Sequence, residues 1–133
     1  MPERSDQNAD QDPGRNGGPH RGPYADPHVD PRADLDAAVQ RLAGRLRALP
    51  QRRLRSGAAA TGLELARWLA REAQLLEFPG REPYVMPDDG VFVVGDQLAL
   101  AGRELLAVAR IPEHYGLLAE AREKVAQAAR AVD

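Results

Sequence analysis

The sequence predicts an all-α protein, a small antiparallel helical bundle of about four helices that follows a disordered N-terminal tail. Three observations predict this fold. A chain of 133 residues has room for one domain, the first 33 residues have the composition of a tail, and apolar stripes at helical spacing follow them. We therefore expect a tail over residues 1–33 and a helical bundle domain over residues 34–133.

The tail is rich in residues that oppose regular structure. Residues 1–33 hold six of the 11 prolines and four of the 12 glycines, and Val29 is their only aliphatic side chain larger than Ala. Such a segment cannot bury enough apolar surface to offset its ordering entropy. Repeated Asp-Pro steps also bias the residue before each proline away from helix, so we expect order to begin near Asp34.

The first helix is expected over residues 34–48, with Asp34 as its N-cap. Its apolar face repeats at intervals of four and three residues and consists of Leu35, Val39, Leu42, Leu46 and Leu49. Pro50 ends this helix.

A second helix is expected over residues 51–77, since a proline is tolerated where a new helix starts. Its stripe continues the same spacing through Leu54, Ala58, Thr61, Leu65, Trp68, Glu72 and Leu76. Gly57 and Gly62 each cost about 1 kcal/mol relative to Ala, so the first half of this helix is expected to be the weaker part.

The next segment, residues 78–90, is dense in helix breakers and is the only substantial loop expected. Residues 84–86 and 91–94 around Pro-Asp-Asp-Gly suit a short β-hairpin. The spacing of Val91, Val94 and Leu98 instead suits a helix capped by Asp88 or Asp89. We favour the helix because an isolated two-stranded hairpin is marginally stable.

The C-terminal part of the sequence is expected to be helical in either case. Residues 96–110 continue the apolar spacing. A last helix is expected over residues 112–132, with Pro112 in its first turn. Short connections between the stripes favour packing of these helices into a bundle.

The composition excludes several classes of protein. The absence of cysteine excludes disulfides, thiolate metal ligands and Cys nucleophiles. No stretch approaches the roughly 18 apolar residues of a membrane span, and residues 1–11 lack the basic and apolar regions of a secretory signal. We therefore expect a cytoplasmic protein without a membrane partner.

Of the 18 Lys and Arg residues, all except Lys124 are Arg, a bias that a GC-rich bacterial genome would produce.

The strongest charge pattern lies between Asp36 and Glu64. The residues between them include no acid and six arginines, which we call the Arg corner: Arg41, Arg45, Arg47, Arg52, Arg53 and Arg55. A local charge of +6 within a chain of net charge −2 makes this corner a candidate contact for an acidic protein, a second copy or nucleic-acid phosphate. The simplest interpretation is a solvated corner, since no aromatic residue lies between Tyr24 and Trp68 to stack on bases.

Candidate catalytic and metal-binding groups have simpler interpretations. His20 and His28 lie among carboxylates of the tail, where no rigid element would hold a metal ion. The carboxylates of residues 88–104 have no His, Lys or Ser nearby in sequence to share acid–base chemistry. Asp88 and Asp89 suit turn and cap positions. We therefore expect no catalytic residue, no metal site and no cofactor.

Two functions of different classes follow from these observations. The first is a small non-enzymatic helical protein that acts through protein–protein contact or self-association, because several helices have apolar faces wider than one neighbour would cover. The sequence favours neither a homodimer nor a monomer. The alternative is an accessory, sequence-nonspecific nucleic-acid-binding protein that uses the Arg corner, and its binding would weaken steeply with salt.

Overall fold

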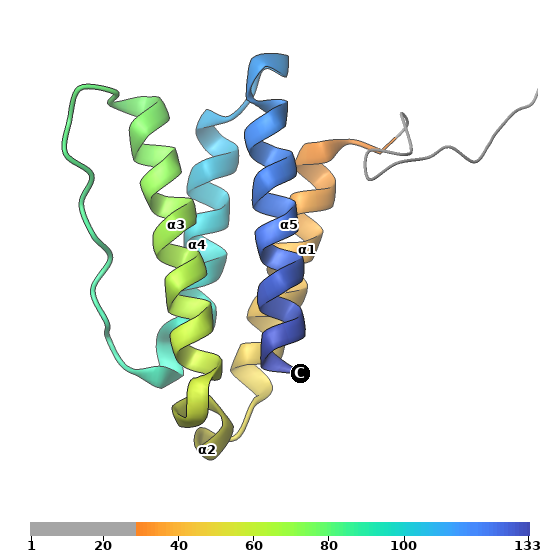
Figure 1. The fold of residues 1–133 in the computed structure, drawn as a ribbon, viewed down its shortest axis with the longest axis vertical. Helices are drawn as coiled ribbons and strands as arrows, with labels where there is room; N and C mark the ends of the chain where they lie inside the picture. The colour runs from red at the N-terminus through yellow and green to blue at the C-terminus, as the bar shows by residue number, and fades with distance from the viewer. Residues whose placement is uncertain (1–28) are drawn as a thin grey trace, which may run out of the picture. The chain divides into compact units, whose positions relative to one another are not determined.

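The apolar stripes form helices in the computed structural model, which describes residues 29–133. The four long helices are α1 (Pro31–Ala48), α3 (Ala59–Glu77), α4 (Val94–Val108) and α5 (Tyr115–Val132) (Figure 1). No β-strand occurs within the described residues. The expected all-α bundle of about four helices is confirmed, whereas the predicted tail lies outside the described residues as far as position 28.

Helix α1 begins at Pro31, ahead of the expected start at Asp34. A proline in the first turn of a helix loses no hydrogen bond, because the first N–H groups have no helical partner. Arg32 Nη1 donates to the carbonyl oxygens of Leu106 at 2.5 Å and Ala109 at 2.9 Å. Arg32 therefore satisfies carbonyls at the C-terminal end of α4, which explains why order extends into residues assigned to the tail.

The second predicted helix covers its expected range but bends near its start. Helix α2 (Gln51–Arg53) continues into a π-helical segment, η2 (Leu54–Ala58), and then into α3. Gly57 has a φ of 139°, a backbone conformation that glycine adopts without the steric cost of a Cβ. The π-helical turn at this glycine accounts for the kink, so Gly57 sets the direction of α3 in addition to weakening the helix.

The segment 78–90, which we call the strap, begins with a turn at residues 79–80 and contains no helix or strand. It runs back along the outside of α3 to the start of α4 (Figure 1). A 3-10 turn, η3 (Val91–Val93), leads into α4, so the helix that we favoured over the hairpin is confirmed. The expected cap is wrong, because Asp88 Oδ1 accepts from the N–H of Gly90 at 3.0 Å and the helix begins beyond that turn.

A second 3-10 turn, η4 (Pro112–His114), precedes α5. The turn η4 and helix α5 together cover the range 112–132 that we expected for the last helix. None of the helices in the described part of the chain is both long enough and apolar enough to span a bilayer.

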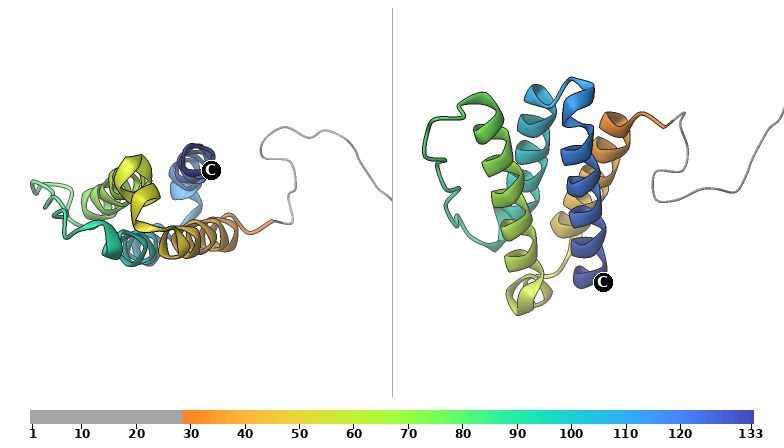
Figure 2. Two further views of the ribbon diagram at one scale, coloured as in Figure 1. Left: turned by 90° about the horizontal axis from the view of Figure 1, so that it is seen from below. Right: turned by 45° about the horizontal axis from the view of Figure 1, so that its top comes forward.

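Each long helix packs against two others. Helices α1 and α3 each contact both α4 and α5 (Figure 2). The position of Gly95 beside Ala43, and of Gly102 beside Val39, shows that α1 and α4 are antiparallel. Asp34 of α1 pairs with Arg122 of α5, and Arg45, later in α1, pairs with Asp133 just after α5, so α1 and α5 are parallel. The strap returns the chain to the end of the bundle where α3 starts, so α3 and α4 also run in the same direction (Figure 1). The expected antiparallel packing therefore holds for α1 and α4 but is wrong for the α3–α4 and α1–α5 pairs, because the strap is a long return and not a short connection.

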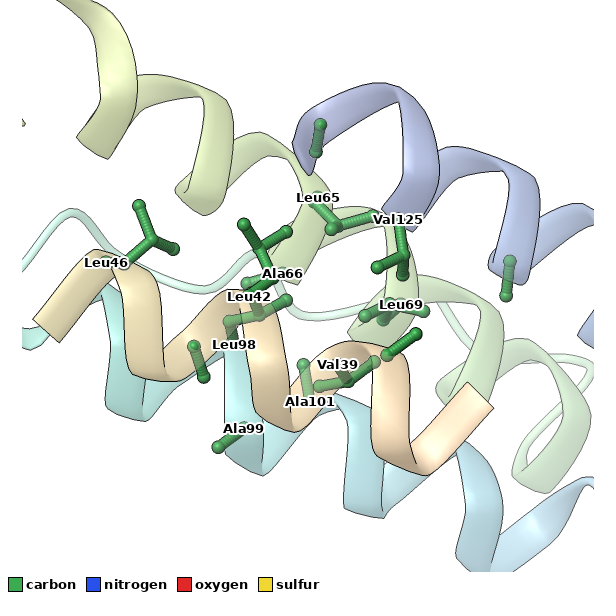
Figure 3. Close-up of a cluster of buried hydrophobic side chains, with 14 of the residues drawn as sticks. Val39, Leu42, Leu46, Leu65, Ala66, Leu69, Leu98, Ala99, Ala101 and Val125 are labelled. Atoms are coloured by element: carbon green, nitrogen blue, oxygen red, sulfur yellow. The ribbon is translucent and has the colours of Figure 1, made fainter. Parts of the chain in front are cut away.

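The core is formed by the inner faces of these helices. Leu42 of α1, Leu98 of α4 and Leu69 of α3 are at most 2% exposed and meet between the helices (Figure 3). The buried face of α3 includes Leu65, as expected, but continues through Leu69 and Ala73 instead of Trp68 and Glu72, one position further along the chain. Trp68 is therefore only partly buried, and Lys124 Nζ lies 5.1 Å from its ring centroid.

Candidate functional site

The Arg corner extends from the second half of α1 through α2 into η2, and three of its members bind other parts of the chain. Arg47 Nε donates to Asp96 Oδ1 at 2.8 Å, and Arg45 pairs with Asp133. Arg53 Nη2 donates to the carbonyl oxygen of Val132 at 2.9 Å. Cations beside the last turn of a helix satisfy its free carbonyls and oppose its dipole. Arg45 and Arg53 thus stabilise the end of α5.

The other three arginines are exposed. Gln51 accepts hydrogen bonds from Arg55 Nε at 2.7 Å and Nη2 at 2.8 Å once its amide is oriented to satisfy them. Arg41 and Arg52 make no side-chain hydrogen bond or ion pair with any residue from 29 to 133. The structure therefore divides the Arg corner between capping groups and free cations, and the free positive charge is smaller than the sequence suggests.

A second candidate site is built by the strap, which three long side chains hold against the bundle. The Gln74 amide pairs with both backbone groups of Tyr84, donating to its carbonyl at 2.9 Å and accepting from its N–H at 2.7 Å. Arg67 Nε donates to the carbonyl of Met86 at 2.8 Å, and Gln97 Nε2 donates to the carbonyl of Pro87 at 3.0 Å. Because these side chains come from both α3 and α4, the strap is fixed across the pair.

A groove of about 770 Å³ lies between α3, the strap and α4. Its lining combines small apolar side chains with polar ones and includes no Lys or Arg. The residues are Ala70, Ala73, Gln74, Glu77, Tyr84, Met86, Pro87, Asp89, Gln97, Leu100, Glu104, Ala107 and Val108. This volume is typical of sites that accept small organic molecules.

The strap has exposed apolar side chains. Tyr84 and Val85 are 71% and 67% exposed. Val85 does not line the groove, as expected for an extended segment in which successive side chains point to opposite sides. Of the eight exposed large apolar residues between positions 31 and 133, six lie on the strap, beside its end or in the groove: Phe78, Tyr84, Val85, Phe92, Val93 and Leu100. We call these six residues the strap surface.

The sequence alone predicts no function for the strap. The residues that hold it are 10 or 19 positions away from their partners in sequence, so no local pattern connects them. One signal was present, namely an apolar run at residues 84–86 between two clusters of breakers, in a loop that would otherwise be polar. Asp89, expected at a turn or cap position, and Glu104 of α4 share the lining of one groove.

No protein-family model, curated protein or solved structure matches this chain significantly.

Proposed function

We propose that this chain is a small, cytoplasmic, non-enzymatic helical protein that acts through protein–protein contact or self-association, and that the strap surface is its contact. The observation that carries the proposal is that six of the eight exposed large apolar residues between positions 31 and 133 belong to that surface. Scattered exposed apolar residues are normal in proteins, but their concentration in one region is typical of interaction sites.

The way the strap is held supports the same function. Ordering a loop during association costs free energy that subtracts from affinity. Hydrogen bonds from Arg67, Gln74 and Gln97 already fix the strap backbone, which reduces this cost. Aromatic residues such as Tyr84, Phe78 and Phe92 are also the side chains enriched in protein interfaces.

The alternative, sequence-nonspecific nucleic-acid binding through the Arg corner, has less support. Arg45, Arg47 and Arg53 each have a partner within the chain. Phosphate binding by these side chains would have to replace those contacts. The remaining positive charges, on Arg41, Arg52 and Arg55, lack an aromatic stacking platform beside them in sequence.

The test is site-specific photocrosslinking of the full chain in cells. A benzophenone amino acid is placed at Val85 on the strap surface or, as a control, at Glu120 on the exposed face of α5. We expect a discrete adduct from position 85 and none from position 120. An adduct of twice the chain mass indicates self-association, and any other discrete protein adduct indicates a separate partner. Equal adducts from both positions, or none from position 85, would overturn the proposal.

A further inference from the structure

We infer that the groove beneath the strap binds a small organic cation, namely an ammonium group on an apolar stem. This site goes beyond the proposed protein contact, since it lies on the inner side of the strap. It shares only Tyr84 and Leu100 with the strap surface.

The charge of the lining selects a cation. Three carboxylates, Glu77, Asp89 and Glu104, line the groove and no Lys or Arg does. A cation entering the groove therefore meets attraction from both helices and from the strap, whereas an anion meets repulsion from each.

The hydrogen-bonding groups that line the groove also favour a ligand that donates hydrogen bonds. The amide nitrogens of Gln74 and Gln97 already donate to strap carbonyls. The carboxylate oxygens of Glu77, Asp89 and Glu104 accept hydrogen bonds and do not donate them. An ammonium group supplies up to three N–H donors to such acceptors. The Tyr84 hydroxyl can donate or accept and so does not discriminate.

The size of the groove favours an organic cation over a metal ion. Within residues 29–133, no three His, Asp or Glu side chains lie close enough together to hold a metal ion. The volume of about 770 Å³ is instead suited to a molecule with a stem of several carbon atoms. Apolar contacts for that stem are available from Ala70, Ala73, Met86, Leu100, Ala107 and Val108.

The test compares three probes that share a six-carbon stem, hexylammonium, hexanoate and 1-hexanol, by titration of the ¹⁵N-labelled full chain. We expect hexylammonium to shift the amide signals of residues 84–89 and 97–108, 1-hexanol to bind several-fold more weakly, and hexanoate to leave the signals unchanged. Nα-acetyl-lysine methylamide forms a fourth arm. Tighter binding of this derivative assigns the cation to a partner's lysine, and tighter binding of hexylammonium assigns it to a free amine.

Two variants locate the site. Replacing both Glu77→Gln and Glu104→Gln, which are exposed and not part of the core, should weaken hexylammonium binding about fivefold, as expected for the loss of two exposed charge pairs. Ala107→Leu should block the groove without loss of folding, because Ala107 is exposed. The matched control is the double variant Glu64→Gln with Glu120→Gln, at two exposed carboxylates outside the groove, and it should bind as the unaltered chain does.

Three results would overturn the inference. The first is the absence of hexylammonium shifts in the strap and α4. The second is binding of hexanoate as tightly as hexylammonium. The third is unchanged hexylammonium binding in the Glu77→Gln, Glu104→Gln chain and in Ala107→Leu. None of these results bears on the photocrosslink from Val85, so the groove and the strap surface are tested separately.

Discussion

The α1–α4 contact and the strap both depend on α4, but different interactions stabilise them. Between α1 and α4, Leu42 and Leu98 are at most 2% exposed, and Gly95 brings α4 so near α1 that a Cβ there would lie 2.8 Å from the Ala43 carbonyl oxygen. In the strap, Tyr84 and Val85 are largely exposed. Hydrogen bonds from three polar side chains hold its backbone.

This difference separates the stability of the protein from its proposed function. Burying a Leu side chain contributes about 1.5–3 kcal/mol, whereas a typical hydrogen bond contributes a net of about 0.5–1.5 kcal/mol. The α1–α4 contact is therefore part of the global stability, and the strap is expected to open locally at lower free energy. We therefore expect that side chains of the strap surface can be substituted without unfolding the bundle.

The largest effect is expected from removing a core side chain of α4. Leu98→Ala should lower the free energy of unfolding by about 2–5 kcal/mol, because Leu98 is fully buried. Leu65→Ala should fall in the same range, since Leu65 is 6% exposed. The matched control is Leu100→Ala on the same helix, which is 48% exposed and should cost less than about 1 kcal/mol. Urea denaturation followed by circular dichroism measures all three, and equal losses at positions 98 and 100 would contradict the assignment of the core face.

The second effect tests the close approach of α1 and α4. Gly95→Ala should destabilise by about 1–3 kcal/mol, because the added methyl meets a backbone carbonyl that cannot move aside easily. Gly44→Ala, in the interior of α1, has no atom within 4 Å of the added methyl and should stabilise by about 0.5–1 kcal/mol through helix propensity. The two substitutions are chemically identical, so opposite signs in thermal unfolding isolate the packing effect.

The helical core could be predicted from the sequence alone. Leu42, Leu46 and Leu98 lie on stripes whose period matches the helix, so periodicity alone placed them in the core. The strap could not be predicted in the same way. Its fixed path depends on Gln74 and Gln97 reaching backbone groups of a segment without periodicity.

The Arg corner shows a further reason why a candidate site was only partly predictable. A run of arginines without acids is evident in the sequence, but its partners are far away in the chain. Arg45 pairs with Asp133, 88 positions away, and Arg53 reaches Val132, 79 positions away. Charge patterns along the sequence do not show which charges the fold brings together. The sequence therefore overstates how many arginines of the Arg corner are without a partner.

A smaller effect is expected when the strap is released. Gln74→Ala removes the paired hydrogen bonds to Tyr84, so the Tyr84 amide should exchange with solvent at least tenfold faster. The amide of Leu98 in the core should change much less, because global stability should fall by only about 1 kcal/mol. Gln127→Ala, at an exposed position on α5, is the control and should alter neither. Hydrogen exchange followed by NMR makes the measurement, and equal acceleration at Tyr84 and Leu98 would show that the strap does not open independently.

The smallest effect is expected at the Arg corner, from the triple change Arg52→Gln, Arg53→Gln and Arg55→Gln. The Arg53 contact with the Val132 carbonyl and the exposed hydrogen bonds from Arg55 to Gln51 are lost, so the melting temperature should fall slightly. The native mass by light scattering should not change. Neither the unaltered chain nor the variant should retard duplex DNA at physiological salt, because the rest of the chain is acidic and the net charge of the whole is −2.

Two contrary results would give the Arg corner a function. Retardation of duplex DNA by the unaltered chain at that salt, lost in the triple variant, would favour the nucleic-acid alternative over contact through the strap surface. A fall in native mass that salt above 0.15 M reproduces, where the screening length drops below about 8 Å, would instead show self-association through charge. In that case the dimer contact would lie at the end of the bundle, and the photocrosslink from Val85 should not give an adduct of twice the chain mass.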